Sequence, residues 1–224
     1  MIGDETRLDY SRCRERLLER IGEPAPGHVQ LLAGPRQVGK TTLLLELQER
    51  LGEAALYAAG DEPAAALPGF WERTWREAEA RAERGKAVLL LDEVQQVPEV
   101  FAFVRSRIDR QPRRTGQWLL TGSQEAPLMQ GVTESMAGRA AVLQLLPLST
   151  RETPKVTLLR GGYPEAVARP GGARLWFSSY LQTYLERDVR AVTAVKDLAT
   201  FRRFLAIVAS RHGQVLNKTD LAAP

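Results

Sequence analysis

The chain has 224 residues, of which 44% are hydrophobic and 26% charged, and its formal net charge is +4. These values are ordinary for a soluble globular protein and suit one α/β domain with a sizeable core and a smaller appendage. The only cysteine, Cys13, excludes an internal disulfide, fits a reducing compartment and is expected to serve in helix packing. Because no apolar stretch approaches the about 18 residues that cross a bilayer, and the N-terminus is too polar for a signal peptide, we expect a cytoplasmic protein without a membrane partner.

The first part of the chain alternates helical and strand patterns. An amphipathic pattern predicts a helix over residues 6–21, and the Gly- and Pro-rich residues 22–27 end it. Apolar runs predict strands over residues 29–33 and 54–58, with a helix that opens at Thr42 between them.

The same alternation continues through the middle of the chain. Helices are expected over residues 67–83 and 98–109, and buried strands over residues 87–91, 117–121 and 141–146. Trp71 and Trp75 lie at i, i+4 in the first of these helices and are expected to contact the core. Strands that alternate with helices predict a parallel sheet with helices on both faces.

The composition then changes to a turn-rich segment, followed by helical patterns over residues 173–191 and 198–211. We therefore expect two domains, residues 1–155 and a small helical region over residues 156–224. Residues 217–222 are typical of a capped helix start, but the sequence ends at Pro224, before one full turn of that helix. The second domain is therefore expected to be incomplete.

Arginines gather near the end of one predicted helix: Arg105, Arg107, Arg110, Arg113 and Arg114. The favoured interpretation is a solvated helix end, where cations are stabilised by the helix dipole. A surface for nucleic acid or for the phosphates of a neighbouring subunit is the alternative. No interleaved aromatic residues or nucleic-acid fold motif support that alternative.

A phosphate-binding pattern, the Walker A sequence G-x-x-x-x-G-K-[ST], follows the first predicted strand and opens the next helix. Its residues, with the threonine that follows them, are Gly34, Pro35, Arg36, Gln37, Val38, Gly39, Lys40, Thr41 and Thr42. In this context the backbone N–H groups of the loop and the positive end of the helix surround a polyphosphate. Lys40 is expected to reach the β and γ oxygens, and the Thr41 hydroxyl to ligate Mg²⁺.

A second signature, of the Walker B type, ends the predicted central strand with Asp92 and Glu93. Asp92 is expected to hold Mg²⁺, through water, and Glu93 to polarise the attacking water as a general base. The alternative is an acidic turn after a buried strand, which a neighbouring phosphate loop disfavours.

Two further groups are candidates for contact with the γ-phosphate. Thr121 and Ser123 lie at the end of the strand predicted over residues 117–121, and their hydroxyls are placed to sense or position the phosphate or the water. Thr-Gly-Ser is also a common turn. Arg139 precedes another strand and is a candidate for stabilising phosphoryl charge, within the chain or across a subunit contact. Its alternative role is a solvated or ion-paired side chain.

Taken together, these motifs resemble the prokaryotic AAA-type ATPases that carry a C-terminal domain of unknown function, the AAA_14/DUF4143 group. The resemblance covers about residues 10–221. It rests on the motifs at residues 34–42, 91–98, 120–123, 135–139 and 147–149, and on residues 161–165 and 184–190 in the second region.

The resemblance implies a P-loop ATPase fold of the AAA type, ATP and Mg²⁺ as ligands, and a sensor role for Thr121 or Ser123. It also favours the catalytic interpretation of Arg139, and with it self-association or a protein partner. Two features depart from the group: the segment between Ser149 and Gly161 is shorter, and members of the group continue well past Leu221.

Three functions are compatible with these residues. The preferred one is a Mg²⁺-dependent ATPase whose turnover drives a conformational change in the C-terminal region, because Glu93 directly follows Asp92 as hydrolysis requires. The alternative is a nucleotide-dependent switch or DNA-binding regulator with negligible turnover. A small-molecule kinase is a third, but neither an Arg-rich lid nor an acceptor motif is visible.

Overall fold

The structure is a computed structural model, and it describes residues 7–22, 29–84, 87–97, 99–110, 118–122, 136–184, 197–215 and 217–219. The chain divides into two compact units, Met1–Ala173 and Arg174–Pro224. The predicted domain boundary after residue 155 stays a prediction.

In the residues that the structure describes, the first unit contains a six-stranded sheet in the order β1-β6-β2-β5-β4-β3, in which every strand pair is parallel. The strands are β1 (Arg7–Leu8), β2 (Val29–Ala33), β3 (Ala55–Ala59), β4 (Val88–Asp92), β5 (Trp118–Thr121) and β6 (Ala140–Leu145). The main helices of this unit are α1 (Tyr10–Ile21), α2 (Lys40–Leu51), α3 (Phe70–Arg84) and α4 (Val100–Arg110), followed by the short α6 (Pro164–Ala168).

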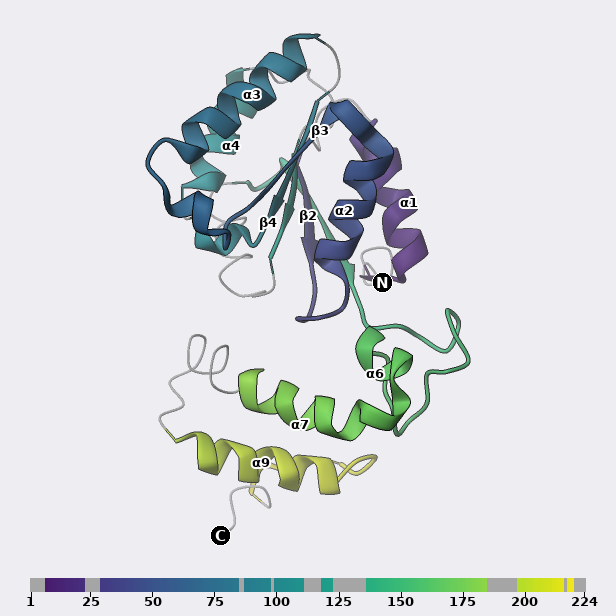
Figure 1. Cartoon of the computed structure of the whole chain (residues 1–224). Helices are drawn as coiled ribbons and strands as arrows, with labels where there is room; N and C mark the ends of the chain where they lie inside the picture. Colours follow the sequence, from purple (N-terminus) through teal and green to yellow (C-terminus); the bar gives the residue numbers. More distant parts are fainter. Residues whose placement is uncertain are drawn as a thin grey trace. The chain divides into compact units, whose positions relative to one another are not determined.

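Two layers of helices cover the sheet, α1 and α2 on one face and α3 and α4 on the other (Figure 1). Successive residues of each central strand point to opposite faces, so Leu31 packs toward α3 and α4 while Leu32 packs toward α1 and α2. Such burial on both faces requires the unbroken apolar runs seen in the sequence. The predicted parallel sheet with helices on both faces is therefore confirmed.

Helix starts account for most differences from the predicted boundaries. α1 begins at Tyr10 rather than at residue 6, because the Asp9 side chain caps it by accepting a 2.8 Å hydrogen bond from the Arg12 N–H. α3 begins at Phe70 rather than at residue 67, since Gly69 has a φ of 74° that no helix allows. The two-residue strand β1, paired with the distant β6, was not predicted.

Aromatic side chains fill the core between α3, α4 and the sheet. Trp75 is buried and stacks on Phe103 with 4.1 Å between ring centroids, and it also lies 5.8 Å from Trp118. Trp71 is half-buried and packs against the same core. The expected core role of both tryptophans is confirmed.

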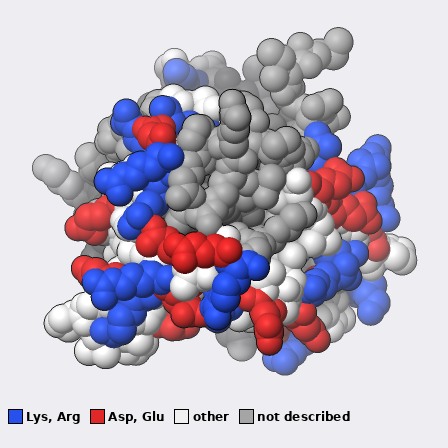
Figure 2. Space-filling view, turned by 90° about the horizontal axis from the view of Figure 1, so that it is seen from above, with Lys and Arg blue, Asp and Glu red and all other residues white. Residues whose placement is uncertain are grey.

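Lysines and arginines are mixed with aspartates and glutamates over the described part of the face in Figure 2, and ion pairs place acids beside two members of the predicted arginine cluster. Arg107 pairs with Glu79, and Arg105 lies 3.7 Å from Asp109. These pairs agree with the interpretation of a solvated helix end. Arg113 and Arg114 lie outside the described residues.

The second unit contains α7 (Ala173–Tyr184), which begins at the unit boundary, and α9 (Leu198–Ser210). The Asp197 side chain caps α9 by accepting a 2.9 Å hydrogen bond from the Ala199 N–H. The predicted continuation of α7 to residue 191 falls outside the described residues. Among the helices that the structure describes, none has both the length and the apolar character to span a membrane.

Cys13 provides a test of the packing of α1. Its side chain is fully buried against α2 and the sheet, and this burial raises the pKa of the thiol to about 12. Because the thiolate is the reactive form, we expect iodoacetamide to leave the native chain unmodified and to label it fully in denaturant. Intact-mass spectrometry measures both states, and rapid labelling of the native chain would contradict the packing.

Candidate nucleotide site

The loop between β2 and α2 is held against the sheet by a close backbone approach. A Cβ atom on Gly34 would lie 2.3 Å from the carbonyl oxygen of Leu145, so only glycine fits there. Gly39 has a φ of 101° and precedes the first residue of α2. It has no side chain to cap the helix, so the first-turn N–H groups of α2 are left for an anion.

Lys40 is the first residue of α2, and its side chain folds back over the loop. The ammonium donates hydrogen bonds to the carbonyl oxygens of Gly34 (2.8 Å) and Pro35 (2.7 Å). Only 5% of the residue is exposed. These contacts keep a buried cation within the loop that the sequence assigns to phosphate.

Asp92 ends β4 as a buried carboxylate that hydroxyl groups surround. It is 3% exposed and accepts a 2.5 Å hydrogen bond from Thr41 Oγ1, and another from Thr121 Oγ1 at the end of the adjacent strand β5. Tyr57 Oη approaches it at 3.4 Å from β3. Burial, and then the charge of Asp92, raise the pKa of Tyr57 above its ordinary value, so the phenol stays protonated and can donate.

Glu93 turns out of the strand through a left-handed backbone conformation, with a φ of 49°. This conformation costs on the order of 1 kcal/mol for a residue with a Cβ, and such strain clusters at functional sites. The Glu93 N–H bonds to Asp92 Oδ1 at 3.0 Å, and the side chain accepts a hydrogen bond from Gln95 Nε2. Of these two successive acidic residues, Asp92 is buried and Glu93 is half-buried.

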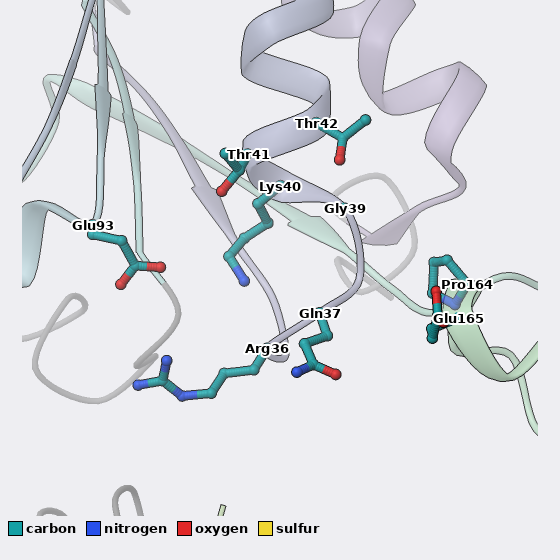
Figure 3. A pocket seen from close by; sticks show the side chains of 9 residues that line it. All are labelled: Arg36, Gln37, Gly39, Lys40, Thr41, Thr42, Glu93, Pro164 and Glu165. Atoms are coloured by element: carbon teal, nitrogen blue, oxygen red, sulfur yellow. The ribbon is translucent and has the colours of Figure 1, made fainter. Parts of the chain in front are cut away.

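One cavity of about 430 Å³ brings the phosphate loop and Glu93 together (Figure 3), whereas Asp92 is not among its lining residues and reaches the site through its hydrogen bond from Thr41. Its lining residues are Arg36, Gln37, Gly39, Lys40, Thr41, Thr42, Glu93, Pro164 and Glu165. Gly34, Pro35 and Val38 are not among them and support the loop instead: Val38 is buried in the core, and Gly34 and Pro35 bond to Lys40.

The remaining candidates separate into three cases. Thr121 is buried, donates a hydrogen bond to Asp92 and is not among the lining residues. Ser123 lies outside the described residues. Arg139 forms a 2.9 Å ion pair with Asp109 at the end of α4 and is not among the lining residues, which agrees with its alternative role as an ion-paired side chain. Its catalytic role stays a prediction.

Pro164 and Glu165 were missed as site residues. The sequence Gly161-Gly162-Tyr163-Pro164-Glu165 resembles the start of the second domain and gives no sign of a role in the phosphate site. Nothing in its local pattern indicates that it reaches the phosphate loop more than 120 residues earlier in the chain.

The family comparison agrees with this geometry. The family model described as an AAA domain, AAA_14, matches residues 27–153, which is more than half of the chain. The chain belongs to this AAA domain family. The match contains the phosphate loop and both carboxylates of the site. The family thereby supports a nucleotide-binding, ATPase-like protein.

The second region matches a different model from the one that the sequence resemblance named. Residues 151–224 match DUF8612, a domain of unknown function, so the DUF4143 part of the resemblance is not confirmed. Uncharacterized proteins of Mycobacterium bovis and Mycobacterium tuberculosis are each 30% identical over 229 residues. These matches cover 96% of this chain and 47% of each relative, so the chain spans about half the length of these relatives.

Solved structures of low identity show partial likeness. The Aeropyrum pernix ORC2 protein has a TM-score of 0.41 and 16% identity, and the match covers 64% of this chain and 48% of that one. PCH-2 of C. elegans has a TM-score of 0.38 and 19% identity, with 61% and 40% covered.

Proposed function

We propose that this AAA domain binds ATP with Mg²⁺ and hydrolyses it to ADP and phosphate. The observation that carries the proposal is that Lys40, Thr41 and Glu93 line the same cavity, while Asp92 Oδ2 lies 2.5 Å from Thr41 Oγ1. Cation, metal ligands and general base are the parts that phosphoryl transfer to water requires.

The oxygen atoms present fit Mg²⁺. This ion prefers hard oxygen ligands and is commonly bound through one or two protein oxygens, with water and substrate phosphates completing the shell. Thr41 Oγ1 and Asp92 Oδ2 are adjacent oxygens of this kind, and they would hold the ion beside the loop. When bound, Mg²⁺ supplies charge neutralisation for the β and γ oxygens.

Glu93 would perform the proton transfer of the reaction. A water oxygen forms a bond to the γ-phosphorus, the bond from that phosphorus to the bridging β-oxygen breaks, and ADP leaves with the electron pair. The Glu93 carboxylate accepts the proton of the attacking water. The hydrogen bond from Gln95 orients this carboxylate before substrate binds.

The proposal also includes the choice of nucleotide, the roles of Thr121 and Arg139, the response of the C-terminal region and the location of the protein. ATP is favoured over GTP by the family alone, and Thr121 would act on the phosphate site through its bond to Asp92. Turnover would change the conformation of the C-terminal region. Arg139 would stabilise phosphoryl charge, within the chain or across a contact with a second copy or a protein partner. A cytoplasmic location is consistent with the single cysteine.

The test is phosphate release from ATP and from GTP, with and without Mg²⁺. The wild-type chain should release phosphate from ATP only with Mg²⁺, and Lys40→Ala should lower the rate by about 10²-fold or more, because the cation that faces the β and γ oxygens is gone. Lys155→Ala is the matched control, since Lys155 is an exposed lysine of the same unit. ATP binding by the wild type without phosphate release would contradict hydrolysis and favour the nucleotide-dependent switch.

A further inference from the structure

The second matched family region reaches into the phosphate cavity. Pro164 and Glu165 lie in the residues that match DUF8612, beyond the last residue of the AAA match, yet both line the same cavity as Lys40 and Thr41. α6, which carries them, belongs to the same compact unit as the sheet. The cavity is therefore completed by a segment outside the AAA match.

This segment is fixed by backbone contacts rather than resting loosely on the surface. The Leu148 N–H donates a 2.7 Å hydrogen bond to the Gly162 carbonyl, and a Cβ atom on Gly162 would lie 1.9 Å from the Leu148 carbonyl oxygen. Ala166 and Val167 of α6 are buried. Contacts of this kind hold the neighbouring Glu165 in place.

The two carboxylates of the cavity lie on opposite sides of the phosphate loop. Figure 3 shows Glu93 on one side, Pro164 and Glu165 on the other, and the loop residues between them. In a phosphate loop the lysine meets the β and γ oxygens, and the general base stands beyond the γ-phosphate. The nucleoside must then leave the loop on the side away from Glu93, which is the side of Glu165.

We propose that Glu165 is a specificity-determining residue that accepts a hydrogen bond from the nucleoside of the bound nucleotide. This inference rests on the proposed function, since it uses the same site. A carboxylate accepts donors and repels phosphate oxygens. Its natural partners in a nucleotide are therefore a ribose hydroxyl or an amino group of the base.

The ion pair that Glu165 already makes leaves acceptor positions of its carboxylate available. Arg169 lies 3.1 Å from one oxygen of Glu165 in an i, i+4 pair, and the Arg169 side chain is 80% exposed. Exposed ion pairs of this kind contribute little to the free energy of folding. A carboxylate offers about four acceptor positions, so it can accept a further donor beside this pair.

The test compares binding of ATP with binding of inorganic tripolyphosphate, which has no nucleoside. Glu165→Ala should lower the affinity for ATP by about tenfold, the usual effect of losing one hydrogen bond to a charged group. It should leave the affinity for tripolyphosphate unchanged. Glu165→Gln keeps one acceptor oxygen, so its affinity for ATP should fall less than that of Glu165→Ala. Arg169→Ala is the matched control: it removes the ion pair alone and should leave both ligands unchanged.

Three analogues identify the donor. If it is a ribose hydroxyl, either 2′-deoxy-ATP or 3′-deoxy-ATP should bind equally to the wild type and to Glu165→Ala. If it is the amino group of the base, the analogue without the 6-amino group should do so. An unchanged tenfold effect with all three analogues would overturn the inference, as would a loss of ATP affinity by Arg169→Ala equal to that of Glu165→Ala.

The outcomes separate the inference from the proposed function. Failure of the wild type to bind either ATP or tripolyphosphate would contradict the nucleotide site itself. Tight binding of both ligands, with no difference between their responses to Glu165→Ala, would retain the site and overturn only the role of Glu165. Thermal melting of each variant shows that the fold is kept.

Discussion

Glu93→Gln is expected to bind ATP normally and to lose phosphate release by about 10²- to 10⁴-fold, the usual contribution of a general base. The amide cannot accept the proton of the attacking water, whereas the phosphate loop and Asp92 are unchanged. Glutamine has the same shape as glutamate and tolerates the φ of 49° equally well, so the backbone turn at this position should persist.

The measurement combines ATP binding by calorimetry with phosphate release under single-turnover conditions. Glu72→Gln is a suitable control, because Glu72 is an exposed glutamate at the start of α3. Wild-type turnover by Glu93→Gln would show that another group takes the proton. Loss of ATP binding in the same variant would instead assign Glu93 to the binding of nucleotide.

The sheet was predictable because its signals are local. Apolar runs such as residues 87–91 are long enough to predict a strand and too apolar for a half-exposed one. Each predicted strand of the sheet lies within one residue of its place in the structure. The predicted starts of α1 and α3 differ from the observed ones by several residues, because the cap at Asp9 and the left-handed Gly69 depend on a single side chain and a single φ angle.

Short motifs likewise predict most of the residues that line the cavity, and only Pro164 and Glu165 of its lining were not expected. Thr41, Asp92 and Glu93 are recognisable because strand, loop and helix follow one another in the expected order. The approach of Thr121 to Asp92 depends on β5 lying between β2 and β4, which the sequence suggests only by analogy with doubly wound sheets. Glu165 needed the folded chain.

Long-range pairs explain the remaining differences. The ion pair of Arg139 with Asp109 joins residues 30 positions apart, and neither residue has a neighbour in sequence that indicates the other. The same holds for β1, whose two residues are too few to produce a periodic pattern and are ordered by pairing with β6. Tertiary contacts decide such features, so the local sequence does not specify them.

Among alanine substitutions of the glycines in the phosphate loop, Gly34→Ala is expected to have the largest effect on the free energy of unfolding and on turnover. The new Cβ would meet the Leu145 carbonyl oxygen at 2.3 Å, and neither strand can yield easily, because β2 and β6 pair over five residues. We expect a loss of about 1–3 kcal/mol in the free energy of unfolding, the range for overpacked sites. The loop would shift with its Gly34 carbonyl, which is a partner of Lys40, and a displacement of about 1 Å at a catalytic group can lower turnover by about 10²-fold.

Gly171→Ala is the control for this substitution, because a Cβ at Gly171 has no heavy atom within 4 Å. Urea denaturation and ATP turnover should both be nearly unchanged in this control and strongly reduced in Gly34→Ala. If Gly34→Ala were as stable as Gly171→Ala but inactive, the methyl group would be blocking phosphate directly rather than displacing the loop. If Gly34→Ala were both stable and active, the close approach of the loop to β6 would not be a requirement of the site. The comparison therefore tests whether the sheet itself sets the position of Lys40.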